Sequence, residues 1–207
     1  HNRVRRQRQM CIRDRHKYKL FDDDDDDCDF QNCIPENWYT TNFDDSEWGM
    51  NATPFGNEEI GGVTPNTIWQ SESGKEDYLI VRHYFNYEKP EEVLSSTFKI
   101  AHNNYYIAYL NGNLIRDCSW YQNHDGCYED DPDYWNNILT YDGSQSSGPN
   151  PDWLVEGENV LAILAIDITW GGDTEQWLDF ELAINVPSWK DVPLSLIHIS
   201  EPTRLGA

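Results

Sequence analysis

Residues 105–115 read YYIAYLNGNLI, and this stretch does more than any other to decide the fold class. Two runs of apolar and aromatic residues flank the pair Asn111-Gly112. Both of these residues tolerate the positive φ angles of a type I′ turn, which joins two antiparallel strands through a two-residue loop. The stretch therefore predicts a β-hairpin.

Further strands are predicted on both sides of the hairpin. Residues 78–87 and 93–101 have the length of strands and are rich in aromatic and β-branched residues. After Gly157, a nearly continuous apolar run reaches residue 166, which indicates a strand buried on both faces. Between them, residues 117–152 are rich in Asp, Asn, Gly and Pro and are predicted to form a long insert without strands.

Residues 176–186 alternate between apolar and polar side chains, which is typical of a strand with one buried face. The side chains predicted to face the core are Leu178, Phe180, Leu182 and Ile184. Those predicted to face water are Asp179, Glu181 and Asn185. Helical periodicity and internal repeats are absent from the sequence, so the strands predict an all-β, antiparallel sandwich.

Several residues have structural interpretations within this sandwich. Asp44, Asp45 and Ser46 fit a turn in which an Asp side chain bonds to the backbone and Trp48 enters the core. Asn159 is expected to fix its own loop by side-chain hydrogen bonds to the backbone. The residues predicted to form the core are Trp48, Phe85, Phe98, Leu161 and Phe180.

Both ends of the chain resemble translated sequencing-adaptor sequence, as found in metagenomic fragments, and residues 1–15 and 194–207 are therefore expected to be non-native. A natural basic leader with a short tail is the alternative. The native part is predicted to comprise an acidic disordered leader at 16–37, the sandwich at 38–186 and a linker at 187–193. The leader includes six consecutive Asp residues at 22–27, which lack the alternating ligands of a calcium loop and suit a solvated tail.

The chain is strongly acidic, with 37 acidic and 15 basic residues and a formal charge of −22. The six Arg and one Asp of residues 1–15, with the one Arg and one Glu of residues 194–207, leave a charge of −27 on residues 16–193. Such a surface repels nucleic-acid phosphates and anionic lipids, so neither is expected as a partner. An apolar run of 18 residues is also absent, and no membrane insertion is predicted.

Four cysteines remain when Cys11 is set aside with the first segment. Their close spacing predicts the disulfides Cys28–Cys33 and Cys118–Cys127 and a secreted, extracellular protein. Zinc is the competing interpretation, but neither pair has the C-x2-C spacing and no histidine stands at a ligand interval.

Six short segments occur in an order that resembles galactose-binding-like domains: residues 43–48, 54–56, 82–85, 109–112, 157–162 and 178–182. The series is similar to the sugar-binding jelly roll of β-galactosidase-type glycoside hydrolases, and most similar to free-standing copies appended to extracellular proteins. The resemblance implies a jelly-roll sandwich over residues 38–186. It also implies a structural calcium ion at the sandwich edge, for which Asp44 and Glu181 are the expected ligands.

Motifs typical of hydrolase, metalloprotease or nucleotide-binding sites are absent from the sequence, so no catalytic residue is predicted. The preferred hypothesis is a non-catalytic carbohydrate-binding or accessory module of a larger extracellular protein, with a glycan or neighbouring domains as partners. Aromatic rings stack on the C–H faces of sugars, and short polar side chains bond to the hydroxyls. The predicted ligand-binding residues are Trp120, Tyr121, Asp125, Trp135, Trp170 and Asp173. The alternative is a structural or adhesive surface domain without glycan affinity, in which the same rings are buried.

Overall fold

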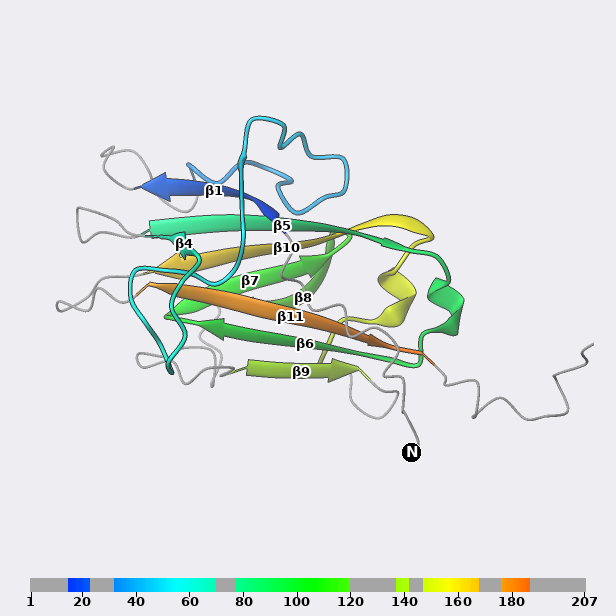
Figure 1. The fold of residues 1–207 in the computed structure, drawn as a ribbon. Helices are drawn as coiled ribbons and strands as arrows, with labels where there is room; N and C mark the ends of the chain where they lie inside the picture. The colour runs from blue at the N-terminus through cyan, green and yellow to red at the C-terminus, as the bar shows by residue number, and fades with distance from the viewer. Residues whose placement is uncertain are drawn as a thin grey trace, which may run out of the picture.

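The computed structural model describes residues 15–22, 32–69, 77–119, 137–141, 147–167 and 176–186, which form two packed sheets (Figure 1). The first, sheet A, has the order β2 (Gly49–Asn51), β1 (His16–Asp22), β5 (Asp77–Tyr87), β10 (Gly157–Asp167), β7 (Tyr105–Leu110) and β8 (Asn113–Cys118). The second, sheet B, has the order β4 (Thr67–Ile68), β3 (Phe55–Gly56), β11 (Trp177–Asn185), β6 (Ser95–His102) and β9 (Asn137–Tyr141). The fold is an all-β sandwich, as predicted.

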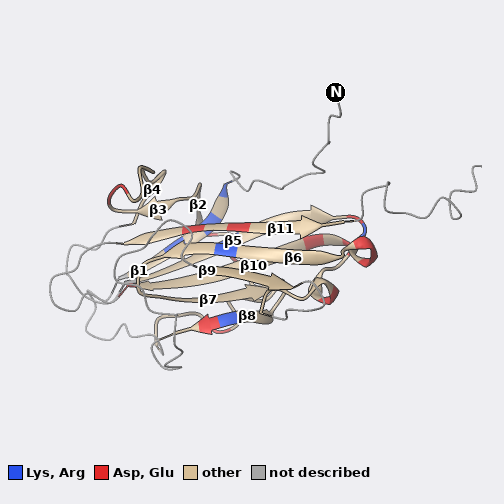
Figure 2. Ribbon diagram, turned by 90° about the horizontal axis from the view of Figure 1, so that it is seen from below, with Lys and Arg blue, Asp and Glu red and all other residues tan. Residues whose placement is uncertain are grey.

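The strands pair antiparallel in every described ladder except that of β3 with β4, which is parallel. Helical structure in the described residues is limited to two 3-10 turns, η1 (Pro90–Glu92) and η3 (Pro151–Trp153). Figure 2 shows acidic residues at the η1 turn and only scattered charged bands along the strands. None of the helices in the described ranges has the length and apolar character needed to cross a membrane.

The predicted hairpin is confirmed, and its turn is tied to a neighbouring strand. Asn111 and Gly112 have φ angles of 49° and 82°, as a type I′ turn requires. The Asn111 side chain donates to Asn159 Oδ1 at 2.7 Å and accepts from the Val160 amide at 2.8 Å. Asn159 in turn donates to the carbonyls of Val155 and Gly157, as predicted. The hairpin turn and the start of β10 are therefore held as one unit.

The main core lies between the two sheets and follows the two-residue period of the strands. The strand β10 contributes Leu161, Ile163 and Ala165 to it, each fully buried. The predicted core residues Phe85, Phe98, Leu161 and Phe180 all belong to this cluster.

A second apolar cluster lies on the outer face of sheet A. The intervening residues of β10, from Val160 to Ile166, pack there together with Ile80 and Ile107. Trp38 and Trp48 cover them, so the segment 32–48 forms a third layer, which we call the outer cover. This cover buries the second face of β10, as its continuous apolar sequence predicted. Trp48 is thus a core residue, as expected, but in the outer cluster.

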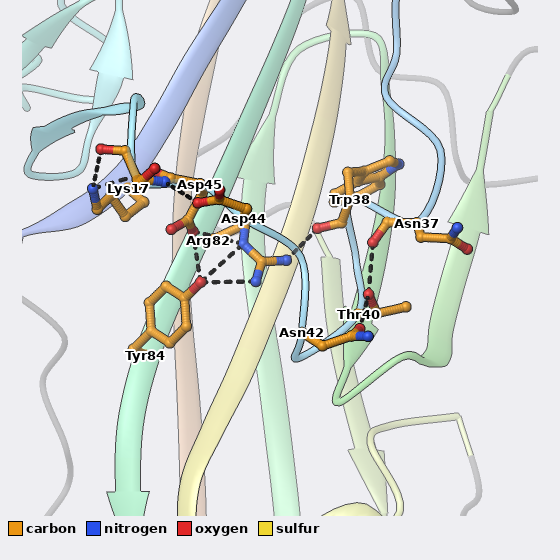
Figure 3. A network of polar contacts seen from close by, with 10 residues as sticks. Lys17, Asn37, Trp38, Thr40, Asn42, Asp44, Asp45, Arg82 and Tyr84 are labelled. Atoms are coloured by element: carbon orange, nitrogen blue, oxygen red, sulfur yellow. Dashed lines mark hydrogen bonds and ion pairs between the residues drawn. The ribbon is translucent and has the colours of Figure 1, made fainter.

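One buried charge network attaches the outer cover to sheet A (Figure 3). Arg82 of β5 is fully buried and donates through Nε to Asp45 Oδ2 at 2.8 Å. The Tyr84 hydroxyl donates to the same oxygen at 2.6 Å, and Arg82 Nη1 donates to the Trp38 carbonyl. Asp44 accepts from the Ser46 amide at 3.0 Å, which confirms the predicted turn, and this bond is the main reason that its pKa is lowered.

The prediction that residues 16–37 form a disordered leader is wrong where the structure describes them. Residues 16–22 form β1, which pairs with both β2 and β5, and Ile34 packs into the outer cluster. Apolar and polar residues alternate in β1 over only a few positions next to the run of Asp residues, so the composition of the segment did not indicate a strand. Residues 137–141 likewise form β9 inside the predicted insert, where Leu139 enters the core.

The docking of β1 places two histidines together inside the sandwich. His16 and His83 approach through their Nδ1 atoms at 3.0 Å, and both side chains are buried. Phe180 packs against His16, and Phe85 stacks on His83. Burial first, and then the neighbouring His83, lower the pKa of His16 from 6.5 to about 3, so its ring is neutral in the folded protein.

The prediction that Asp179 of β11 faces water is wrong, because only 7% of this residue is exposed. It pairs in register with Ala101, which belongs to a small cluster with Ile60 and Trp177 on the outer side of sheet B. This cluster covers one end of the face that the alternation predicted to be exposed. Glu181, two residues further on, is only partly buried and forms an ion pair with Lys99 at 3.5 Å.

The network predicts that Asp45→Asn destabilises the fold far more than Asp44→Asn, although both substitutions remove one negative charge. The first leaves the Arg82 guanidinium buried without a counter-charge, which costs about 3–5 kcal/mol. The second changes an exposed carboxylate and preserves an acceptor for the Ser46 amide, so we expect little loss of stability. Urea unfolding of both variants measures this difference. Equal losses would show that the pair does not hold the cover.

Candidate functional site

Buried polar residues gather at one end of the sandwich, which we call the polar end. This end lies at the left of Figure 1, where β6 and β10 finish and β11 begins. Its members have exposed fractions of 5% or less: His102, Asn103, Asn104, Ser119, Asp167 and Gln176. Polar groups are costly to bury without hydrogen-bond partners, so their concentration marks this end as a specialised region.

The strand register brings the bases of the two predicted binding loops together at the polar end. Cys118, at the start of the insert, pairs with Tyr106 of β7. Ile166, just before the second loop, pairs with the adjacent Tyr105. Both loop bases therefore flank the same two residues of β7, on the order of 10 Å apart, since neighbouring strands are separated by about 4.8 Å.

Hydrogen bonds join the two sides of the second loop. Gln176 Nε2 donates to Asp167 Oδ2 at 3.1 Å, across residues 168–175. The backbone N–H of Gln176 donates to Asn57 Oδ1 at 3.0 Å, and the backbone N–H of Asn103 donates to the Trp177 carbonyl at 3.2 Å. These bonds link β10, β11 and the connection from β6 to β7. The role of Gln176 as a brace was not predicted, because it depends on contacts between residues that are distant in the sequence.

His102 and Tyr106 supply neutral polar groups beneath the loop bases. Their rings lie 4.6 Å apart between centroids. Burial lowers the pKa of His102 from 6.5 to about 3, although contacts with the backbone at Asn103 and Asn104 act in the opposite direction. Burial likewise raises the pKa of the Tyr106 hydroxyl, which has no hydrogen-bond partner within the described ranges. The floor of the polar end is therefore uncharged at these two groups near neutral pH.

The residues predicted to bind ligand lie outside the described residues, so their contribution stays a prediction. They are Trp120, Tyr121, Asp125, Trp135, Trp170 and Asp173. The structure tests only the placement of their segments, and it brings the bases of both segments to the same end of the sandwich.

The structure does not bring together the two predicted calcium ligands. Asp44 belongs to the outer cover, on the outer face of sheet A. Glu181 lies on β11 of sheet B and, because its neighbour Phe180 faces the core, points away from sheet A. A single ion cannot bridge them through the sandwich. Within the described ranges, no three His, Cys, Asp or Glu side chains are grouped to hold a metal. A structural calcium ion stays a prediction without assigned ligands.

The predicted disulfides involve Cys28 and Cys127, which lie outside the described residues. Of their predicted partners, Cys118 is fully buried in the main core at the end of β8, and Cys33 lies in the outer cover. The pairings Cys28–Cys33 and Cys118–Cys127 therefore stay predictions.

No protein-family model and no curated protein matches the chain. Among solved structures, it is similar to a glycosyl hydrolase family 2 member from Bacteroides cellulosilyticus DSM 14838, with 13% identity and a TM-score of 0.48 over 85% of this chain and 20% of that one. It is also similar to a β-glycosidase from Bacteroides vulgatus, with 14% identity and a TM-score of 0.47 over 85% and 20% of the two chains. A PA14 sugar-binding domain from an RTX adhesin matches at 12% identity and a TM-score of 0.29, over 60% and 55%. The chain thus spans about a fifth of the length of these two glycosidases.

The neutral histidines predict that stability falls when the pH drops below 6.5. His16 and His102 take up protons in the unfolded chain at pH values where burial keeps them neutral in the fold. Their stabilisation is complete above pH 6.5 and is lost progressively as the pH falls towards 3, at about 1.4 kcal/mol per pH unit for each residue. Between pH 7 and pH 5 this amounts to about 2 kcal/mol for each.

Urea unfolding of the wild type and of His102→Gln at pH 7 and pH 5 measures this effect. The variant is expected to lose the contribution of His102, about 2 kcal/mol of the stability difference between pH 7 and pH 5, whatever its absolute stability. An unchanged pH dependence would contradict the neutral, buried state of His102.

Proposed function

We propose that this chain is a carbohydrate-binding accessory module of a larger extracellular protein, and that its glycan binds at the polar end. The observation that carries the proposal is the convergence there of the bases of two segments. Segment 120–136 is rich in aromatic and short polar residues, and segment 168–175 holds Trp170 among short polar residues. Two such segments on one rigid base can present a single surface to one ligand.

The chemistry of the polar end suits a neutral, hydroxyl-rich ligand. Its buried groups are amides, hydroxyls, a neutral imidazole and one carboxylate, with no lysine or arginine among its defining residues. These groups brace the segments through bonds such as Gln176 to Asp167. Because the base is braced, less conformational entropy is lost when a loop closes on its ligand. The modest binding free energy that sugar hydroxyls provide can then be sufficient.

Within the proposed site, the indole rings of Trp120 and Trp170 would stack on the apolar C–H faces of sugar units. The carboxylates of Asp125 and Asp173 would accept hydrogen bonds from sugar hydroxyls, and Tyr121 and Trp135 would extend the aromatic surface. A high negative charge on the whole chain agrees with a neutral glycan rather than a polyanionic one.

The proposal predicts that Trp120→Ala and Trp170→Ala each reduce glycan affinity about ten-fold or more without lowering the melting temperature. Loss of one stacked ring costs about 1–3 kcal/mol of binding free energy. A glycan array identifies the ligand of the wild type, and titration calorimetry with that ligand compares the variants. Trp153→Phe offers a matched control, because η3 places this tryptophan at the opposite end of the sandwich.

Two outcomes would contradict the proposal. One is a wild-type chain that binds no glycan on the array, which would favour the structural or adhesive alternative. The other is a fall in melting temperature for both tryptophan variants with ligand affinity retained, which would mean that the rings serve packing only.

A further inference from the structure

A second recognition surface lies on the outer face of sheet A, away from the polar end. A concavity of about 330 Å³ opens where the outer cover meets β7. The residues that determine its chemistry are Glu36, Asn37, Trp38, Tyr39, Ile107 and Tyr109. Its volume falls at the lower end of the range for small-molecule sites, which suits one or two sugar units.

Three aromatic rings give the concavity a rigid wall. Tyr39 and Tyr109 stack with centroids 4.2 Å apart and an angle of 14° between their planes. Trp38 stands perpendicular to both rings, at 5.7 Å from Tyr39 and 5.6 Å from Tyr109. The nearly equal distances place Trp38 beside the stack rather than on top of it. Both tyrosines are partly exposed, so ring surface outside their mutual contact lines the concavity.

The buried network of Arg82 fixes this wall in place. The Trp38 carbonyl accepts a hydrogen bond from Arg82 Nη1, and the Asn37 carbonyl accepts from the Thr40 hydroxyl at 2.8 Å (Figure 3). Asn37 has a φ angle of 60°, a left-handed conformation that this turn requires. The aromatic wall is therefore preorganised, and little conformational entropy is lost when a ligand binds.

The electrostatics of the concavity favour a positive charge. Glu36 supplies an exposed carboxylate, Asn37 supplies an exposed amide, and the lining contains no lysine, arginine or histidine. Burial first, and then Tyr39 and the charge of Asp117, raise the pKa of the Tyr109 hydroxyl. The formal charge of the whole chain, −22, adds to the same negative potential. An anionic ligand is disfavoured here, whereas a ring with an ammonium group is complementary.

We propose that the concavity between the outer cover and β7 binds an amino sugar. The C–H face of the pyranose packs on the tyrosine rings, the ammonium group pairs with Glu36, and a hydroxyl bonds to the Asn37 side-chain amide. This second site lies on the opposite side of sheet A from the inter-sheet polar end, so it operates independently of the function proposed above.

The test uses three sugars of similar size that differ at one position: D-glucosamine, N-acetyl-D-glucosamine and D-glucose. Ligand-observed NMR titration at pH 6 gives the dissociation constants. We expect glucosamine to bind about five-fold more tightly than the other two, because only its ammonium group can pair with the Glu36 carboxylate. Equal affinity for the three sugars would overturn the proposal.

Substitutions separate the charge from the rings. Glu36→Gln is expected to remove the five-fold preference for glucosamine while leaving the affinity for N-acetylglucosamine unchanged. Glu156→Gln removes the same charge from an exposed position just before β10, outside the residues that line the concavity, and should have no effect. Tyr39→Leu should weaken all three sugars. If Glu156→Gln acts like Glu36→Gln, the preference comes from overall charge, and the assignment of the site is wrong.

Two further arms identify the binding place and the ligand class. Trp120→Ala and Trp170→Ala should leave the affinity for glucosamine unchanged. A loss of glucosamine affinity in either variant would show that the sugar binds at the polar end and would overturn this second site. Choline carries a cationic group without a sugar ring, and it should bind more weakly than glucosamine. Equal or tighter binding of choline would show a general cation site and reject the amino sugar.

Discussion

The fold depends on one buried ion pair, between Arg82 of β5 and Asp45 of the outer cover. Arg82 is fully buried, yet its partner on β10, Ala162, belongs to the apolar cluster on the outer face of sheet A. Its guanidinium is satisfied by the Asp45 carboxylate, the Tyr84 hydroxyl and the Trp38 carbonyl, which come from two separate segments. Burying such a charge is costly, so the outer cover has one placement in which the cost is offset. An apolar contact of the same area would attract the segment without fixing its position.

Fixing the outer cover explains why β10 is apolar on both faces. A sheet in a two-layer sandwich usually exposes one face to water, but here Trp38 and Trp48 cover that face. The strand β7 contributes to both proposed binding surfaces, because it has one face on each side of sheet A. Tyr106 points towards the interior at the polar end, whereas Tyr109 points outward to meet Tyr39. Because side chains of a strand alternate between its two faces, β7 directs Tyr106 and Tyr109 to opposite sides of sheet A.

Much of this architecture could be predicted from local sequence. The Asn111-Gly112 turn, the alternation of β11 and the doubly apolar β10 each depend on residues that are neighbours in the chain, so periodicity and turn chemistry were sufficient. The errors have non-local causes. The strand β1 is stabilised by its pairing with β5 and by the contact of His16 with His83, which no local pattern indicates. Asp179 follows a correct alternation but is covered by a cluster around Ile60.

The candidate sites also depend on contacts between residues that are distant in the sequence. Composition identified the two loops as candidate binding segments, but it could not show that their bases meet, because that follows from the pairing of β7 with β8 and β10. The outer concavity was missed because Tyr39 lies 70 positions before Tyr109, and each residue alone resembles an ordinary core or turn residue. The two expected calcium ligands, Asp44 and Glu181, lie on opposite faces of the sandwich, which the order of their segments in the sequence does not reveal.

A double-mutant cycle between Arg82 and Asp45 tests the central claim most directly. Urea unfolding of Arg82→Met, Asp45→Leu and the double variant gives the coupling free energy of the pair. If the ion pair fixes the outer cover, the double variant is more stable than the sum of the single losses implies, with a coupling of at least about 2 kcal/mol, because it leaves no buried charge unpaired. Additive losses, with a coupling near zero, would show that the outer cover is held by apolar contacts alone and would contradict this account.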